Sequence, residues 1–249
     1  MRRTWIAGLL FLSTAAWADT NCFESWWRTR LDDAYSQRGS ASALLPLRQV
    51  DMMRQTAVDP TQIETRFEEI RAAAAIAPGG AKLLLGAEGT EKAFRASAPK
   101  YRIIHLAVHG RANTVYPDRA ALVLLADPTT NEDGLLDSSE IVEMRIGADL
   151  VVLSACDTAV GMLVGQEGVA NLSRAFLSGG TRTVVSTLWA ADDTSATSLL
   201  KRFYAQLQGH ATVTHAMTAA KRDLVKTFHA GPYYWAPYTI EGLGGLRVQ

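Results

Sequence analysis

The sequence has little cysteine and no excess of charge of either sign. Only two cysteines occur among 249 residues, Cys22 and Cys156, and they form no CxxC pair, which excludes a zinc knuckle. Basic and acidic residues both number 25, and no arginine-rich block interleaves with aromatic residues. Balanced charge gives no field that would attract nucleic acid or an anionic membrane. We therefore expect no nucleic-acid partner.

Several catalytic and architectural motifs are also missing. There is no GxSxG nucleophile elbow, no glycine-rich phosphate loop and no tetratricopeptide period. The HxxxH pair of His105 and His109 falls on a predicted strand, where the two side chains would lie ~13 Å apart at ~3.3 Å per residue. That is too far for one ion, so we predict no metal and no organic cofactor, and interpret His105 as a packed histidine beneath the site.

A stretch of apolar and small residues lies at the N-terminus. Arg2 and Arg3 precede an apolar run over residues 5–17, and Ala16-Trp17-Ala18 has the A-x-A form of a cleavage site. This layout is typical of a secretory signal peptide and is too short to span a bilayer stably. We predict a signal peptide over residues 1–18 and a periplasmic or secreted protein without a stable membrane anchor. The alternative is a hydrophobic N-terminal helix on a cytoplasmic protein.

A short apolar run, Leu150–Leu153, is the element around which the remaining sequence is arranged. It is too short for a helix and rich in valine, which favours a strand buried on both faces of a parallel sheet. Cys156 follows it among small residues that allow a tight turn. A second apolar run over residues 102–108 ends at His109-Gly110. Parallel strands end at one edge of a sheet, where open α/β proteins place their chemistry.

Cys156 and His109 have complementary chemistry. An imidazole beside a thiol can take its proton, and the thiolate is the nucleophile. His109 precedes Cys156 by 47 residues (156 − 109), close to the ~50 residues of the caspase pattern. A disulfide with Cys22 would block this nucleophile, so we predict that both thiols are free. The alternative for Cys156 is a small buried apolar residue, the commoner role of a lone cysteine.

Strand and helix patterns alternate along the rest of the chain. Further strands are expected at about 82–85, 120–125, 183–188 and 238–240, with residues 135–136 pairing back as a hairpin. Helices are expected at about 60–77, 90–96, 137–144, 166–177, 193–207 and 213–228. Such alternation predicts an α/β fold with a mostly parallel sheet flanked by helices on both faces. Right-handed crossovers would bring the strand ends at His109 and Cys156 together.

The motifs around these strands resemble a known family. The matching segments follow the family's order and gaps: HLAVHG at 105–110, LSACDT at 153–158, the stretch 165–193, FYAQL at 203–207 and YYWAPY at 233–238. From about residue 80 to 242 the chain resembles a CHAT domain, a caspase-like module of the clan that also holds separases, gingipains and metacaspases. The resemblance implies a caspase-like three-layer sandwich over residues 59–249, preceded by an N-terminal extension at 19–58. Residues 44–53, where such domains usually begin with a hydrophobic strand, carry no clear strand pattern.

The same resemblance implies a cysteine endopeptidase without a cofactor. His109 would be the general base and Cys156 the nucleophile, and the backbone N–H groups of Cys156 and Gly110 would form the oxyanion hole. The partners implied are a protein or peptide substrate and a regulatory protein. The alternative is a catalytically inactive CHAT fold that binds a peptide or a partner protein.

Three further residues are candidates for the substrate pocket. Asp157 could orient His109, line the pocket or cap the following turn. Trp189 and Asp192 follow the next strand, an edge that often contributes to the pocket for the residue before the scissile bond in this fold class. An acidic residue there would favour a basic substrate side chain, whereas simple helix capping is the alternative for Asp192.

Overall fold

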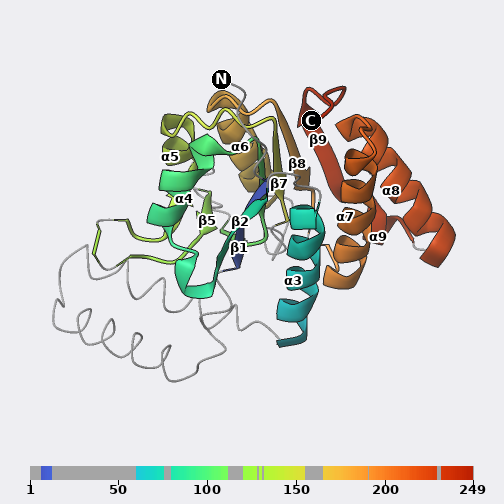
Figure 1. Ribbon diagram of the computed structural model, residues 1–249, viewed down its shortest axis with the longest axis horizontal. Coiled ribbons are helices and arrows are strands. Elements are labelled where there is room, and N and C mark those ends of the chain that lie inside the picture. The colour runs from blue at the N-terminus through green and yellow to red at the C-terminus, as the bar shows by residue number, and fades with distance from the viewer. Residues whose placement is uncertain are drawn as a thin grey trace.

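The fold combines one large sheet, one small sheet and helices on both faces of the large one (Figure 1). The computed structural model describes residues 7–12, 60–75, 80–111, 120–127, 129–130, 132–154, 165–189, 191–228 and 231–248. Within these residues the α/β architecture predicted from the alternating patterns is confirmed. No helix in these ranges is long and apolar enough to span a bilayer.

The large sheet has six strands in the order β2-β1-β3-β7-β8-β9, and every neighbouring pair is parallel except β8 and β9. The strands are β1 (Ala7–Leu12), β2 (Ala81–Leu85), β3 (Ile103–Leu106), β7 (Leu150–Leu153), β8 (Thr183–Thr187) and β9 (Tyr238–Gly242). No side chain of β7 is more than 2% exposed. The valine-rich run is thus a strand buried on both faces, as predicted.

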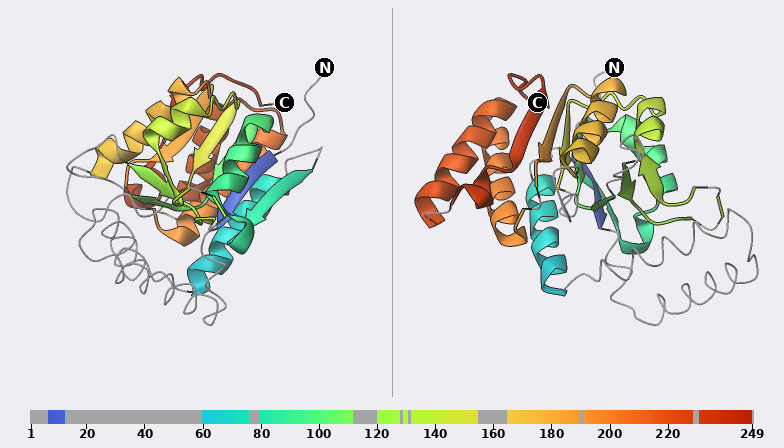
Figure 2. Two further views of the ribbon diagram at one scale, coloured as in Figure 1. Left: turned by 90° about the vertical axis from the view of Figure 1, so that its left-hand side faces the viewer. Right: turned by 180° about the vertical axis from the view of Figure 1, so that it is seen from behind.

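Helices cover the two faces of this sheet and bury a separate apolar cluster on each (Figure 2). One face carries α4 (Glu91–Ser97), α5 (Ser138–Glu143) and α6 (Gly165–Ser178), and the other carries α3 (Pro60–Ala75), α7 (Asp193–Gln208) and α8 (Val213–Phe228). A short helix, α9 (Pro232–Trp235), leads into β9. Side chains alternate along β3, so that Ile104 joins the first cluster and Ile103 the second.

The strand between β2 and β3 comes from an unexpected part of the chain. β1 pairs in parallel with both neighbours and places Phe11 opposite Leu84 on one side and Leu106 on the other. The strand lies within the predicted signal peptide, because a continuous apolar run is typical of both kinds of segment. Cleavage after Ala18 would remove β1, so a processed N-terminus and this six-stranded sheet exclude each other in one molecule. Residues 44–53 lie outside the described residues.

The predicted strand over residues 102–108 is confirmed over Ile103–Leu106 and is wrong at its last two residues. β3 ends at Leu106, and the chain then enters β4 (His109–Arg111) in a separate antiparallel sheet with β5 (Ala121–Val123) and β6 (Leu135–Asp137). Ala107 and Val108 lie between β3 and β4 and are each 1% exposed. The apolar sequence pattern therefore continues past the end of β3 and gives no sign that the strand has ended. The predicted hairpin of residues 135–136 against the preceding strand is confirmed.

Candidate active site

The ends of β3 and β7 lie side by side, as the sequence predicts. The two strands pair in register, with Leu106 opposite Leu153, and the Ser154 N–H donates to the Leu106 carbonyl at 2.9 Å. His109 and Cys156 each stand three residues beyond that pair (109 − 106 and 156 − 153). His109 and Cys156 therefore follow strands that end at the same edge of the sheet, and each comes the same number of residues after its strand.

The reactive atoms themselves are not among the described parts. Cys156 and Asp157 lie outside the described residues, and of His109 only the backbone is described, opposite Val123 in the small sheet. Gly110 is buried and stands opposite Leu122. The structure thus places the two strand ends and the Gly110 backbone, and the Cys156–His109 contact stays a prediction.

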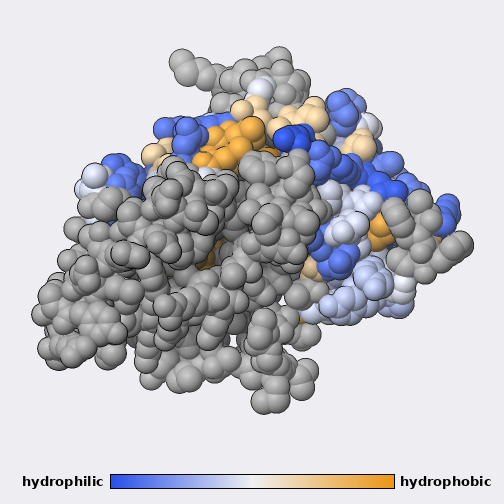
Figure 3. All heavy atoms as spheres, turned by 90° about the horizontal axis from the view of Figure 1, so that it is seen from below, coloured by the Kyte–Doolittle hydropathy of each residue, from blue (hydrophilic) through white to orange (hydrophobic). Residues whose placement is uncertain are grey.

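An aromatic group borders the same edge at the end of β8. Trp189 stacks on Tyr233 with a centroid distance of 6.5 Å, and its Nε1 donates to the Tyr233 carbonyl at 3.2 Å. Tyr233 in turn meets Tyr234 edge to face, and these two tyrosines are 58% and 43% exposed. A view from the side to which the parallel strands point shows mostly hydrophilic residues on the described surface, with hydrophobic residues gathered near the top of the view and a smaller group at the right (Figure 3). Trp189 therefore belongs to an accessible aromatic surface, and its contact with substrate stays a prediction.

Asp192 caps a helix. It precedes α7, and its carboxylate accepts from the Ser195 N–H at 2.9 Å. Its exposed side chain pairs with one of the N–H groups in the first turn that have no partner within the helix. Helix capping was the alternative to a pocket role for Asp192 in the sequence analysis. A role in a substrate pocket stays a prediction.

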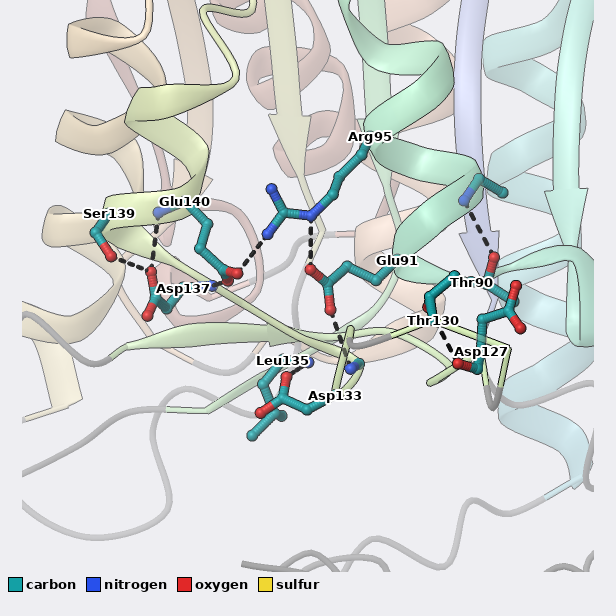
Figure 4. A network of polar contacts seen from close by, with 12 residues as sticks. Thr90, Glu91, Arg95, Asp127, Thr130, Asp133, Leu135, Asp137, Ser139 and Glu140 are labelled. Carbon is teal, nitrogen blue, oxygen red and sulfur yellow. Dashed lines mark hydrogen bonds and ion pairs between the residues drawn. The ribbon is translucent and has the colours of Figure 1, made fainter.

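A buried carboxylate holds the small sheet that begins at His109. Glu91 on α4 is 1% exposed and accepts from Arg95 Nε at 2.7 Å and from the Gly134 N–H at 3.0 Å (Figure 4). Arg95 also pairs with Glu140 on α5. Gly134 forms the turn before β6, so Glu91 ties α4 to the hairpin that pairs with β4. Sequence analysis missed this contact, because an isolated glutamate beside an arginine one turn later is usually a solvent-exposed pair.

Arg95 and Glu140 line an open hollow of about 580 Å³ beside this hairpin. Burial raises the pKa of the Glu140 carboxyl, although the Asp137 N–H and Arg95 oppose that shift. Asp137 and Glu140 also form the predicted capping box of α5. Two of the carboxylates that line this hollow, Asp137 and Glu140, thus serve helix capping and ion pairing.

Gly134 offers a direct test of how tightly the hairpin is held. Its φ is +83°, and a Cβ there would lie 2.7 Å from the Ala126 nitrogen and the Leu124 oxygen. We expect Gly134→Ala to lower the free energy of unfolding by more than ~2 kcal/mol, since a left-handed φ alone costs ~1–2 kcal/mol. Gly80→Ala is the matched control, because Gly80 has a φ of +88° with no atom within 4 Å of its Cβ position. Urea unfolding of both variants measures the difference, and equal losses would show that the backbone contact is unimportant.

His105 lies beneath the site on β3 and is fully buried, as predicted. Its Nδ1 is 2.5 Å from the Tyr204 hydroxyl of α7. Its Nε2 is 2.6 Å from Glu69 Oε1 of α3, a close contact that does not have the geometry of a hydrogen bond. Burial, with the charge of Glu69, raises the pKa of Tyr204 well above its ordinary value, so this hydroxyl keeps its proton. Sequence analysis did not identify Glu69 or Tyr204.

Fold and strand ends together define a caspase-like α/β protein, and comparison with known proteins agrees. The family model of the CHAT domain matches residues 24–242, so the chain belongs to the CHAT domain family. The match begins inside the segment 19–58 that we predicted as an extension. The chain is also 27% identical over 132 residues to Tetratricopeptide repeat protein 28 of Mus musculus. That alignment covers 51% of this chain and only 5% of the mouse protein.

Proposed function

We propose that this protein is a cysteine endopeptidase in which Cys156 is the nucleophile and His109 the general base. The observation that carries the proposal is the register of β3 and β7, whose C-terminal residues Leu106 and Leu153 lie opposite each other. His109 follows one of these strand ends and Cys156 follows the other. Family membership supports a peptidase-type role in general terms. The particular pair of residues is our inference from their position.

The proposed reaction needs only side chains and backbone of this chain. His109 takes the thiol proton, and the Cys156 thiolate attacks the peptide carbonyl to form a tetrahedral intermediate. Backbone N–H groups of Gly110 and Cys156 would stabilise its oxyanion, and one such donor typically contributes ~10²–10³ in rate. His109 then protonates the leaving amine, and water hydrolyses the thioester to release the acid and restore the thiol.

Substrate, partner and location are further parts of the proposal. Trp189 and Asp192 follow the strand next to β7, and Asp157 follows the nucleophile, which favours them as pocket residues. A regulatory protein partner remains part of the hypothesis. Export through residues 1–18 also remains a prediction. The mass of the intact purified protein decides it, since a mature chain would begin at Asp19 and lack β1.

A second function, peptide binding without cleavage, is favoured by one observation. The exposed rings of Tyr233 and Tyr234 stand beside the same sheet edge and could hold an apolar peptide side chain without chemistry. In that case Cys156 would be an inert buried residue.

Labelling with a library of peptidyl acyloxymethyl ketones distinguishes the two functions. We expect covalent modification of Cys156 that disappears in His109→Ala, because the thiol then loses its base. His215→Ala is the matched control, since His215 is an exposed histidine on α8. Cys156 left unmodified by the whole library, together with retained peptide binding, would contradict the peptidase and support the binding module.

A further inference from the structure

We infer that Glu69, His105 and Tyr204 form a buried clamp through which α3 and α7 fix the end of β3 and so position His109. Each clamp residue comes from a different element, and none is more than 2% exposed. His105 stands between the other two, with one ring nitrogen toward each helix. The inference deepens the proposed function, because its consequence concerns the proposed general base.

The clamp acts close to His109 along the chain. Ile70, which follows Glu69 on α3, packs on Ala107, which is two residues before His109. α3 thus contacts the chain at His105 and again just past the end of β3. His105 lies four residues before His109, so a shift of β3 against the two helices would also displace the His109 imidazole.

The stability of the fold does not by itself require polar side chains at the three clamp positions. The surrounding cluster is apolar and includes Ile103 and Val152 on the same face of the sheet. A buried ion pair can often be replaced by well-packed apolar side chains without loss of stability, whereas removing one partner is strongly destabilising. Hydrogen bonds and ion pairs fix direction and distance in a way that apolar contacts do not. The arrangement therefore suits a positioning role.

The same two helices are also joined at the surface, which supplies a control. Lys201 Nζ lies 2.6 Å from Glu68 Oε2, and both side chains are 43% exposed. This pair connects α3 to α7 one residue away from Glu69 but does not touch His105. Lys201→Met thus loosens the helix pair without breaking the clamp. Tyr101→Phe changes another buried tyrosine close to β3, one that belongs to the apolar cluster on the opposite face of the sheet from Tyr204.

The experiment compares Tyr204→Phe with these two controls on the full chain. Alkylation of Cys156 by iodoacetamide is followed from pH 5.5 to 9 by mass spectrometry of the Cys156 peptide, which separates it from Cys22. We expect Tyr204→Phe to slow the reaction about tenfold near pH 6.5, since a poorly placed imidazole leaves more thiol protonated and thiolate changes tenfold per pH unit. Both controls should keep the wild-type profile. A Tyr204→Phe profile equal to that of Tyr101→Phe overturns the inference.

A triple variant separates positioning from stability. Glu69→Leu, His105→Phe and Tyr204→Phe together replace the whole clamp by apolar side chains, and we expect a melting temperature within about 4 °C of the wild type. Its alkylation profile should still be shifted as in Tyr204→Phe. A triple variant with the wild-type profile would show that the clamp serves stability only. Should this variant fail to fold, the comparison of Tyr204→Phe with its controls decides.

Failure of the proposed function would be visible separately. If His109→Ala and the wild type share one alkylation profile, the dyad is wrong and alkylation no longer reports on the clamp. Amide hydrogen exchange at residues 107–110 then decides the inference. Exchange at least tenfold faster in Tyr204→Phe than in Tyr101→Phe supports the clamp, and equal exchange overturns it.

Discussion

Cys156→Ala is expected to lower kcat/KM for a cleaved peptide by about 10⁴-fold or more, and His109→Ala by a similar factor. The two residues would act as one unit, because a thiol without its base is a weak nucleophile and a base without a thiol has nothing to activate. The double variant should therefore be no less active than either single variant. This non-additivity is the signature that distinguishes a dyad from two separate structural losses.

A fluorogenic peptide chosen from the labelling library provides the assay for these three variants. His215→Ala is again the control and should retain wild-type activity. Melting temperatures of all variants within a few degrees of the wild type would show that lost activity reflects chemistry and not unfolding. More than a tenth of wild-type activity in Cys156→Ala would mean that another group is the nucleophile and would end the proposal.

Local signals in the sequence predicted most of the elements near the site. Leu150–Leu153 is a strand because valine and leucine fill a surface that is buried on both sides, and an unbroken valine-rich run too short for a helix indicates this directly. Asp137 and Glu140 predicted the start of α5, because a capping box is a short-range contact. The bounds of α8, Val213–Phe228, were also predicted as the structure has them.

Contacts between distant segments were not predictable in the same way. Glu68 and Glu69 are neighbours on α3, yet the Glu68 side chain is 43% exposed while Glu69 is 2% exposed. Nothing in the sequence distinguishes them, because the burial of Glu69 depends on a histidine 36 residues away (105 − 69) and on a tyrosine of α7. The end of β3 could not be predicted for a related reason. Ala107 and Val108 are buried although they belong to no strand, so their apolar character does not distinguish them from strand residues.

The contact of Glu91 with Arg95 leads to the second prediction of large effect. Burial opposes the charge of Arg95, but its hydrogen bond to Glu91 and the charges of Glu140 and Glu91 raise its pKa, so the guanidinium stays charged. Arg95→Met removes the guanidinium partner of the Glu91 carboxylate, which is 1% exposed in the wild type and also accepts from the Gly134 N–H. Removing one partner of a buried pair costs about 3–5 kcal/mol, and because Arg95 is 27% exposed we expect the lower end, ~3 kcal/mol.

Urea unfolding of Arg95→Met against Lys201→Met tests this expectation. Lys201→Met breaks an exposed ion pair, for which a loss below ~1 kcal/mol is expected. Glu91→Leu combined with Arg95→Met should recover part of the lost stability, because no unpaired charge then remains buried. The Gly134 N–H loses its acceptor in that double variant, which limits the recovery and ties the stability of α4 to the hairpin. A loss in Arg95→Met no larger than in Lys201→Met would show that water reaches Glu91 and that the hairpin is held by its backbone pairing alone.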